Sequence, residues 1–392
     1  MSQIPVNPSP DVLRLIHEGY EVEIRGAHLL ISHVPYVNSA RAVRYGTLVS
    51  ILELNGNVIA TKPQDHKVFF AGEHPCHRDG SLMREIQHAS SNSTLADGIV
   101  VNHSFSNKPS GGYADYHEKM SRYVEVISAP ARAIDPTATA KTFRVVEAKP
   151  CQSVFNYLDT NSSRADIEGI SAKLKGYKVG IVGLGGTGSY VLDLVAKTPV
   201  GEVHLFDGDV FAQHNAFRAP GAPWVEQLEL PPMKVSYFAD IYSKMRRGII
   251  PHPEFLDVSN VAMLNGLSFV FLCLDKGRVK QEIMTFLEAV GASFVDVGMG
   301  VYIGDNNLLG TVRVTASSPA NRALFRKHVS FTDGEDEAYA SNIQIADLNM
   351  LNAALAVLRW KKFAGFYQDL ENEHHTTYST NVNQFLSEKA DA

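Results

Sequence analysis

A glycine-rich turn between a short apolar run and a helical segment constrains this chain most strongly. Residues 179–182 form the apolar run, which is typical of a buried parallel strand. The turn follows the spacing G-x-G-x-x-G, and a helix is expected from about Ser189. Residues 203–206 are predicted to form the second strand, which is followed by Asp207. A strand, a glycine turn, a helix, a second strand and an acid in this order predict a doubly wound α/β fold.

The turn contains Gly183, Gly185, Gly186 and Gly188. Glycines allow backbone N–H groups to approach a phosphate, and the N-terminus of the following helix adds a partial positive charge there. The sequence therefore predicts that a nucleotide binds at this turn.

The residues after the second strand narrow the kind of nucleotide. Asp207 and Asp209 stand at the strand end, Asn215 and Arg218 follow, and Lys234 comes after a proline-rich loop. An ordinary dinucleotide-binding unit needs one acid here, which holds ribose hydroxyls. Such a unit has no need for the side-chain nitrogen donors of Asn215, Arg218 and Lys234. We expect these donors to gather around a triphosphate.

The segments G-x-G-G-x-G-S and D-x-D, with N-x-x-R beyond them, resemble the adenylation domain of ubiquitin-activating enzymes and their bacterial relatives, the ThiF, MoeB and HesA proteins. The resemblance runs from about Arg164 to Val314. It implies a ThiF-type Rossmann-like domain that binds ATP and Mg²⁺. Asp209 would hold the ribose, and Asn215, Arg218 and Lys234 would contact the phosphates.

Two further residues take roles from the same resemblance. Asp275 ends the apolar strand 267–274 and would position Mg²⁺ and the reacting phosphate. Arg164 lies shortly before the first strand, where relatives carry an arginine that crosses to the partner's nucleotide in a dimer. The alternative interpretation is a surface arginine near a helix start.

The chain also departs from the family pattern in its cysteines. It has no C-x-x-C pair, so the structural zinc of many relatives is not expected. No cysteine follows Cys273, which we interpret as a core thiol because it lies in an apolar strand. The catalytic thiol of full activating enzymes is therefore missing from the expected place.

Residues 1–145 lack the phosphate-binding pattern and are predicted to form a smaller α+β domain of unknown role. A linker with a leading helix over 146–170 and the adenylation domain over 171–392 would follow. Within the first domain, a helix over 116–126 is expected to lead into another strand. Pro130 is expected to mark where the chain leaves this domain. Blocks of this kind ahead of a ThiF-like domain resemble modules of bacterial operons that encode ubiquitin-like proteins.

Histidines gather in one N-terminal stretch, where His66, His74, Cys76 and His77 lie close together. One interpretation is a metal site or a reactive thiol. The spacing matches no zinc pattern, which favours a polar loop with locally hydrogen-bonded histidines. Near the other terminus, His374 and His375 are expected in a charged tail.

The composition excludes several classes of protein. A formal net charge of −6 argues against a broad nucleic-acid surface. No apolar run reaches the length of a membrane span, and the N-terminal segment lacks the pattern of a secretory signal. Three cysteines give no disulfide framework. We therefore expect a cytoplasmic protein.

The resemblance implies that a carboxylate attacks the α-phosphorus of ATP, giving an acyl adenylate and pyrophosphate. The expected substrate is the C-terminal glycine of a small ubiquitin-like or sulfur-carrier-like protein, with a separate conjugating or carrier protein as a further partner and a homodimer as the assembly. The alternatives are an NAD- or FAD-dependent oxidoreductase, adenylation of a small molecule or a tRNA base, and a non-catalytic scaffold.

Overall fold

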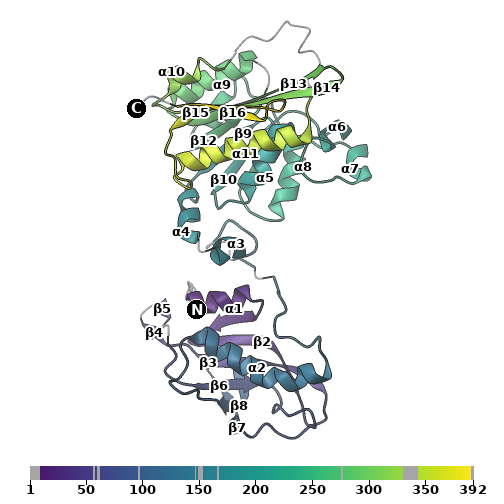
Figure 1. Ribbon diagram of the computed structural model, residues 1–392, viewed down its shortest axis with the longest axis vertical. Coiled ribbons are helices and arrows are strands. Elements are labelled where there is room, and N and C mark those ends of the chain that lie inside the picture. Colours follow the sequence, from purple (N-terminus) through teal and green to yellow (C-terminus); the bar gives the residue numbers. More distant parts are fainter. Residues whose placement is uncertain are drawn as a thin grey trace. The chain divides into compact units, whose positions relative to one another are not determined.

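The computed structural model describes residues 9–55, 58–59, 62–95, 98–145, 147–148, 153–165, 167–274, 277–329 and 343–389. The chain divides into two compact units, Met1–Val146 with Ser163–Ala165 and Glu147–Ser162 with Asp166–Ala392 (Figure 1). No helix in the described part of the chain is long and apolar enough to cross a membrane.

The first unit is built on a six-stranded antiparallel sheet with the order β1-β2-β3-β6-β8-β7. Its strands are β1 (Glu21–Arg25), β2 (His28–Val37), β3 (Val43–Ile51), β6 (Lys67–Ala71), β7 (Gln87–Thr94) and β8 (Val100–Ser106). The short strands β4 (Leu54–Asn55) and β5 (Val58–Ile59) pair separately.

Helices α1 (Pro10–His17) and α2 (Tyr116–Ile134) also contribute to this unit's core. Asp115 caps α2, because its side chain accepts a hydrogen bond from the backbone nitrogen of Glu118 at 2.7 Å. The helix continues through Pro130 to Ile134, so the predicted strand after residue 126 is wrong. The buried face of the helix, which includes Ile127 and Ala131, continues past the predicted end and holds the segment in place.

The second unit contains an eight-stranded sheet with the order β11-β10-β9-β12-β13-β14-β15-β16. The first five strands run parallel, and the last three are antiparallel additions at one edge. The strands are β9 (Lys178–Val182), β10 (Glu202–Phe206), β11 (Ile249–His252), β12 (Phe269–Leu272), β13 (Ser293–Gly304), β14 (Asn307–Ser317), β15 (Glu373–Ser379) and β16 (Gln384–Lys389).

Helices cover both faces of this sheet, and alternate strand residues point to each face. Phe269 and Phe271 pack with α5 (Gly186–Ala196), α8 (Lys234–Ser243) and α11 (Ala346–Phe363). Val270 and Leu272 pack on the other side, against a core that includes α9 (Gly277–Ala289). This arrangement, together with the antiparallel first unit, confirms the predicted fold class of a doubly wound nucleotide-binding-type domain after a smaller α+β domain.

Short helices complete the second unit and the connection into it. These are α3 (Thr160–Arg164), α4 (Glu168–Ser171), the 3₁₀ helix Ala172–Leu174, α6 (Gln213–Ala216), α7 (Val225–Glu229), the 3₁₀ helix Val261–Leu264 and α10 (Arg322–Phe325).

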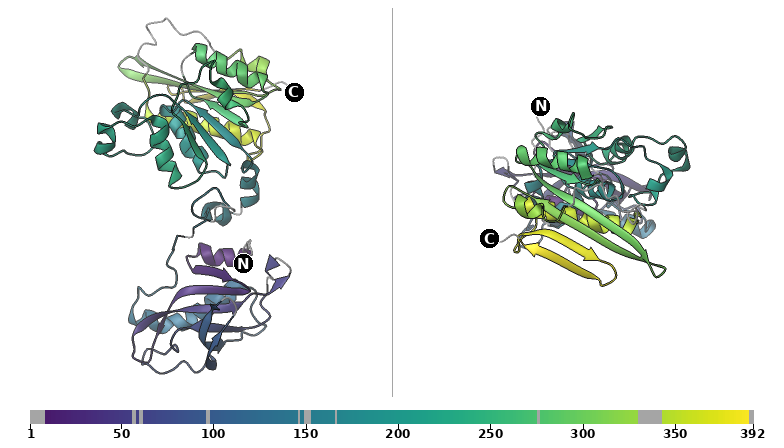
Figure 2. Two further views of the ribbon diagram at one scale, coloured as in Figure 1. Left: turned by 180° about the vertical axis from the view of Figure 1, so that it is seen from behind. Right: turned by 90° about the horizontal axis from the view of Figure 1, so that it is seen from above.

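The C-terminal segment forms the hairpin β15–β16, which extends the sheet beside β14 (Figure 2). His374 and His375 are 1% and 8% exposed in β15, so their expected place in a charged tail is wrong. Pairing with β14 withdraws this strand from water, although its sequence is polar. β16 is the terminal strand of the sheet, and all of its residues are exposed.

Candidate functional site

A cavity of 440 Å³ lies where the carboxyl ends of β9, β10 and β12 meet. The chain leaves β9 toward β10 on one side, while β12 returns on the other, so this is the point where the strand order reverses. Open α/β sheets bind their ligands at such a point. The cavity is lined by Gly183, Gly185, Gly186, Asp207, Asp209, Arg218 and Lys234, among others.

The four predicted glycines have different local surroundings. Gly183 has a φ of +89°, and a Cβ atom there would lie 2.5 Å from the carbonyl oxygen of Cys273. At Gly188 a Cβ atom would lie 1.8 Å from the carbonyl oxygen of Gly183, and at Gly186 it would meet the side chain of Asn349 at 2.1 Å. A backbone oxygen thus excludes a side chain at Gly183 and at Gly188, whereas at Gly186 the side chain of Asn349 would have to move. Gly185 alone of the four has no described atom within 4 Å of such a Cβ position, because it faces the cavity.

Helix α5 begins directly after Gly185. Its N-terminus contributes unpaired backbone N–H groups and a partial positive charge to this end of the cavity. The helix starts earlier than the sequence predicted, since the glycines themselves take part in its first turn. The loop therefore presents a short, backbone-lined cradle suited to an anion.

The two acids after β10 are not equivalent. Asp207 is 7% exposed, and its Oδ2 accepts a hydrogen bond from the backbone nitrogen of Leu184 at 2.6 Å. Its Oδ1 accepts another from the backbone nitrogen of Asp209 at 2.9 Å. Asp207 thus holds the glycine turn against the loop after β10. The side chain of Asp209 is 57% exposed and is free to meet a ligand.

Lys234 joins this pair of acids from the first residue of α8. Its Nζ lies 2.8 Å from Oδ2 of Asp209 and 3.5 Å from Oδ1 of Asp207. Lys234 is 6% exposed, so its charge acts in a site with little water. Its side chain places a cation beside the cavity.

Asn215 and Arg218 both carry buried N–H groups that lack a partner among the described residues. Asn215 is 3% exposed, and its Oδ1 accepts a hydrogen bond from the backbone nitrogen of Ala212 at 2.9 Å, whereas its Nδ2 makes no hydrogen bond. The Nε of Arg218 is buried in the same way, and Arg218 lines the cavity. Buried donors are normally satisfied, so these two groups indicate a missing acceptor.

Two predicted residues cannot be placed in this geometry. Asp275 lies outside the described residues. Arg164 ends α3, and its side chain lies outside the described part of the structure. Their assigned roles stay predictions.

The fold also brings Asn352 into the site, although it was not predicted as a site residue. Its Nδ2 donates to the carbonyl oxygen of Gly298 at 3.0 Å, while its buried Oδ1 has no partner in the described part of the chain. Asn352 comes from α11, far along the chain, and the only sequence signal was a polar residue on an otherwise buried helix face. Cys273 packs against the core as predicted, but it is only partly buried and also lines the cavity, so the thiol is less buried than expected.

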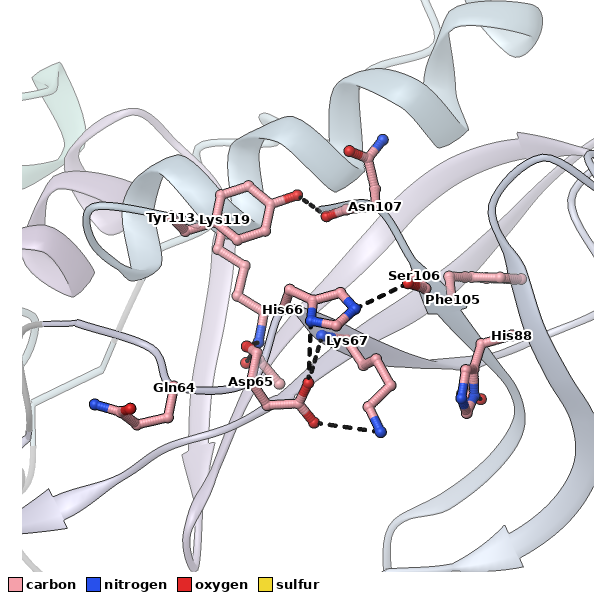
Figure 3. A network of polar contacts seen from close by, with 12 residues as sticks. Gln64, Asp65, His66, Lys67, His88, Phe105, Ser106, Asn107, Tyr113 and Lys119 are labelled. Atoms are coloured by element: carbon pink, nitrogen blue, oxygen red, sulfur yellow. Dashed lines mark hydrogen bonds and ion pairs between the residues drawn. The ribbon is translucent and has the colours of Figure 1, made fainter. Parts of the chain in front are cut away.

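The N-terminal histidines do not form a metal cluster among the described residues. Figure 3 shows His66 with Asp65 on one side and Ser106 on the other, where its Nε2 lies 3.0 Å from the serine Oγ. His74 hydrogen-bonds the carbonyl oxygen of Pro75, and His77 pairs with Glu85. The interpretation as locally hydrogen-bonded histidines is therefore supported over a metal site.

Cys76 is fully buried in the first unit, and its Sγ donates to the carbonyl oxygen of His74 at 3.3 Å. Burial, with smaller contributions from Glu73 and Asp79, raises the pKa of the Cys76 thiol. A thiol that is buried and protonated is a poor nucleophile. The alternative that Cys76 is reactive is therefore disfavoured.

Comparison with known proteins separates the same two parts of the chain. A sequence model described as the ThiF family matches residues 162–385, and a domain of unknown function, DUF6791, matches residues 10–160. No curated protein gives a significant match.

Similar solved structures include two of the Escherichia coli protein MccB. One is its complex with MccA-N7isoASN, with 18% identity, a TM-score of 0.43, and coverage of 56% of this chain and 66% of that chain. A second is its complex with ATP, with 18% identity, a TM-score of 0.42, and coverage of 56% and 65%. PaaA matches with 17% identity, a TM-score of 0.42, and coverage of 59% and 80%. The match thus spans slightly less than two thirds of the MccB chain.

Proposed function

This chain belongs to the ThiF family, and we propose on that basis that it is an ATP-dependent adenylyltransferase. It activates the C-terminal carboxylate of a ubiquitin-like or sulfur-carrier-like protein as an acyl adenylate, with release of pyrophosphate. The observation that carries the proposal is a glycine cradle beside Arg218, which lines the cavity with a buried, unpartnered Nε, while the buried Nδ2 of Asn215 also lacks a partner among the described residues. A polyphosphate would supply the acceptors that these groups lack.

The reaction forms a bond between a carboxylate oxygen and the α-phosphorus of ATP. The bond from this phosphorus to the oxygen that leads to the β-phosphate breaks, and pyrophosphate leaves with that electron pair. No base is required, because a carboxylate is already ionised near neutral pH. The site must instead align two anions and offset their charge.

Arg218 and Lys234 both line the cavity and fit this requirement. Arg218 has donors to spare for phosphate oxygens. Lys234 is held by Asp207 and Asp209, which keep its charge in place before ATP binds. The exposed carboxylate of Asp209 is suited to accept hydrogen bonds from ribose hydroxyls, as proposed from the resemblance.

A magnesium ion would neutralise part of the phosphate charge when it is bound. Asp207 and Asp209 do not suit it well, since both carboxylates already contact Lys234. We therefore keep Asp275 as the proposed magnesium ligand. Arg164 remains the proposed further cation. In a homodimer, its side chain would reach the phosphates of the nucleotide bound by the second subunit.

A nicotinamide- or flavin-dependent oxidoreductase would use the same glycine turn, but it would leave Asn215, Arg218 and Lys234 without a task. Adenylation of a small molecule or a tRNA base would use the same ATP site.

The proposal also covers the setting of the reaction. It includes a cytoplasmic location, a separate conjugating or carrier partner, and domain limits of 1–145, 146–170 and 171–392. Sedimentation tests the homodimer, which a fully active monomer would contradict.

The experiment is release of pyrophosphate from ATP by the full chain, with a candidate ubiquitin-like protein present or absent. Release should require that protein and should stop when its last glycine is deleted. Arg218→Ala protein is the matched enzyme control and should be inactive in both cases. Release that does not depend on the C-terminal glycine would contradict the proposed substrate class. A chain that does not bind ATP would contradict the proposed adenylyltransferase activity.

A further inference from the structure

We propose that His328, His374 and Glu388 form a binding site for a divalent transition-metal ion of the zinc class. One nitrogen from each histidine and one carboxylate oxygen lie within 4.8 Å of one another. The site lies in the second unit, at the sheet edge that carries the hairpin β15–β16. It uses none of the residues assigned to the nucleotide.

His374 provides the main argument for a missing ligand. It is 1% exposed, and neither of its ring nitrogens has a hydrogen-bond partner among the described residues. A buried imidazole without a partner is costly, because its polar atoms have been taken out of water. A metal ion bound to one nitrogen would repay part of that cost.

The backbone presents His374 in an unusual way. Glu373 pairs with Lys389 and His375 pairs with Glu388, so His374 is the extra residue of a bulge in β15. Bulges redirect a side chain from the regular pleat and are frequent beside binding sites. Because of this bulge, the side chain of His374 lies close to that of Glu388 on the neighbouring strand.

His328 approaches from the turn after α10. Its Nε2 lies 3.1 Å from Oε2 of Glu388, but no aligned hydrogen bond joins them. Phe325 and Val329, on either side of His328, are buried and fix the turn. The ring of His375 stacks on His328 at 4.0 Å between centroids and hydrogen-bonds Thr315, which holds the His328 ring in place.

The donor set selects the class of metal. Two imidazoles and one carboxylate suit zinc and its transition-metal neighbours, whereas magnesium and calcium take oxygen ligands. Ligands about 2.1 Å from a tetrahedral ion lie roughly 3.4 Å apart, so the site must contract by about 1 Å. Glu388 can move, since its side chain is 59% exposed.

The ion would cross-link the last strand of the sheet to the rest of the unit. β16 has one strand neighbour and buries none of its residues, so little else holds it. A metal shared by β15, β16 and the turn after α10 would bind this edge to the core of the unit. We expect the hairpin to be ordered more tightly with the metal than without it.

The test uses the full chain, freed of metal with a chelator and titrated with Zn²⁺ in a calorimeter. One ion per chain is expected, with at least about tenfold weaker binding in His374→Ala and Glu388→Gln. His88→Ala, at an exposed histidine in the first unit, is the control and should bind as the unaltered chain does. Glu388→Gln changes an exposed side chain, so it tests the site even if His374→Ala fails to fold.

Amide hydrogen exchange then locates the ion. Zn²⁺ should slow exchange in residues 373–389 of the unaltered chain and of His88→Ala, but not of Glu388→Gln. Equal zinc affinity in all four proteins, or protection that does not include the hairpin, would overturn the proposal. ATP binding is unaffected by either result, so this test is independent of the proposed reaction.

Discussion

The carboxylate of Asp207 accepts a hydrogen bond from the backbone nitrogen of Leu184 at 2.6 Å, which ties the end of β10 to the glycine turn after β9. The same side chain also accepts from the backbone nitrogen of Asp209 and contacts Lys234. One buried carboxylate thus fixes the relative positions of the glycine turn, Asp209 and Lys234. Asp207 therefore holds these parts together from inside the fold, whereas the side chain of Asp209 is exposed.

The first prediction separates these two acids. Asp207→Ala would leave the backbone N–H groups of Leu184 and Asp209 without their acceptor and would remove one of the two carboxylates beside buried Lys234, so it should lower the free energy of unfolding by about 2–4 kcal/mol. Asp209→Ala removes an exposed side chain, so its cost should stay within about 1 kcal/mol. Urea unfolding measures both. Equal losses of stability would refute the division of roles, and Asp209→Ala should still bind ATP more weakly.

The second prediction concerns two glycines of the same turn. Gly185→Val should fold normally, because its φ is −69° and no described atom occupies the side-chain position. It should nevertheless lower ATP affinity at least about tenfold, since the side chain would enter the phosphate's space. Gly188→Ala should instead destabilise the unit, because its Cβ atom would overlap the carbonyl oxygen of Gly183. Unchanged ATP affinity in folded Gly185→Val would exclude this loop as the cradle.

The site residues that could be predicted from the sequence are those that lie close together along the chain. The strands β9, β10 and β12 are buried on both faces, so they show as apolar runs, and the residues after them were found by spacing. The distinct roles of Asp207 and Asp209 could not be predicted, because only the fold shows which carboxylate turns inward. Asn352 was missed for a similar reason, since α11 reaches the cavity from a distant part of the chain.

The edges of both sheets were the least predictable. β7 has the sequence QHASSNST and buries none of its residues, so it lacks the alternation that marks a strand. Its pairing with β8 alone makes it a strand. β15 shows the opposite case: polar residues, including His374, are buried by strands on both sides. In each case long-range pairing overrides the local pattern.

The third prediction tests the cation of the cavity. Arg218→Ala should abolish exchange of pyrophosphate into ATP while leaving the circular dichroism spectrum unchanged, since Arg218 contributes free donors to the site. Arg218→Lys keeps the charge but loses the planar fork, so it should recover little of the activity. Full exchange activity in Arg218→Ala would remove this residue from the mechanism.

The fourth prediction concerns Lys119, whose Nζ hydrogen-bonds Ser50 and the carbonyl oxygen of Asp65. Figure 3 shows the side chain of Lys119 reaching toward Asp65. Burial lowers the pKa of Lys119 from 10.5 to about 8. Between these values the unfolded chain holds a proton that the folded chain has released, so stability rises with pH. From pH 7.5 to 9.5 this lysine should add about 1–2 kcal/mol to the free energy of unfolding.

Urea unfolding at the two pH values, followed by circular dichroism, measures this difference. Lys119→Met should lose the rise with pH, whereas Lys108→Met, at an exposed position of the same unit, should keep it. An equal rise in both variants would show that other groups cause it.

The last prediction concerns the fate of the activated carboxylate. Cys76 is fully buried, its pKa is raised, and His74 and His77 are engaged elsewhere, so no neighbouring base activates it. Direct transfer to a separate carrier or conjugating protein should therefore be the route. Enzyme, ATP and the ubiquitin-like protein, run on a gel without reductant, should show no thiol-sensitive band that depends on Cys76. Such a band, if lost in Cys76→Ser but kept in Cys273→Ser, would mean that the first unit opens to expose its thiol, and direct transfer would be wrong.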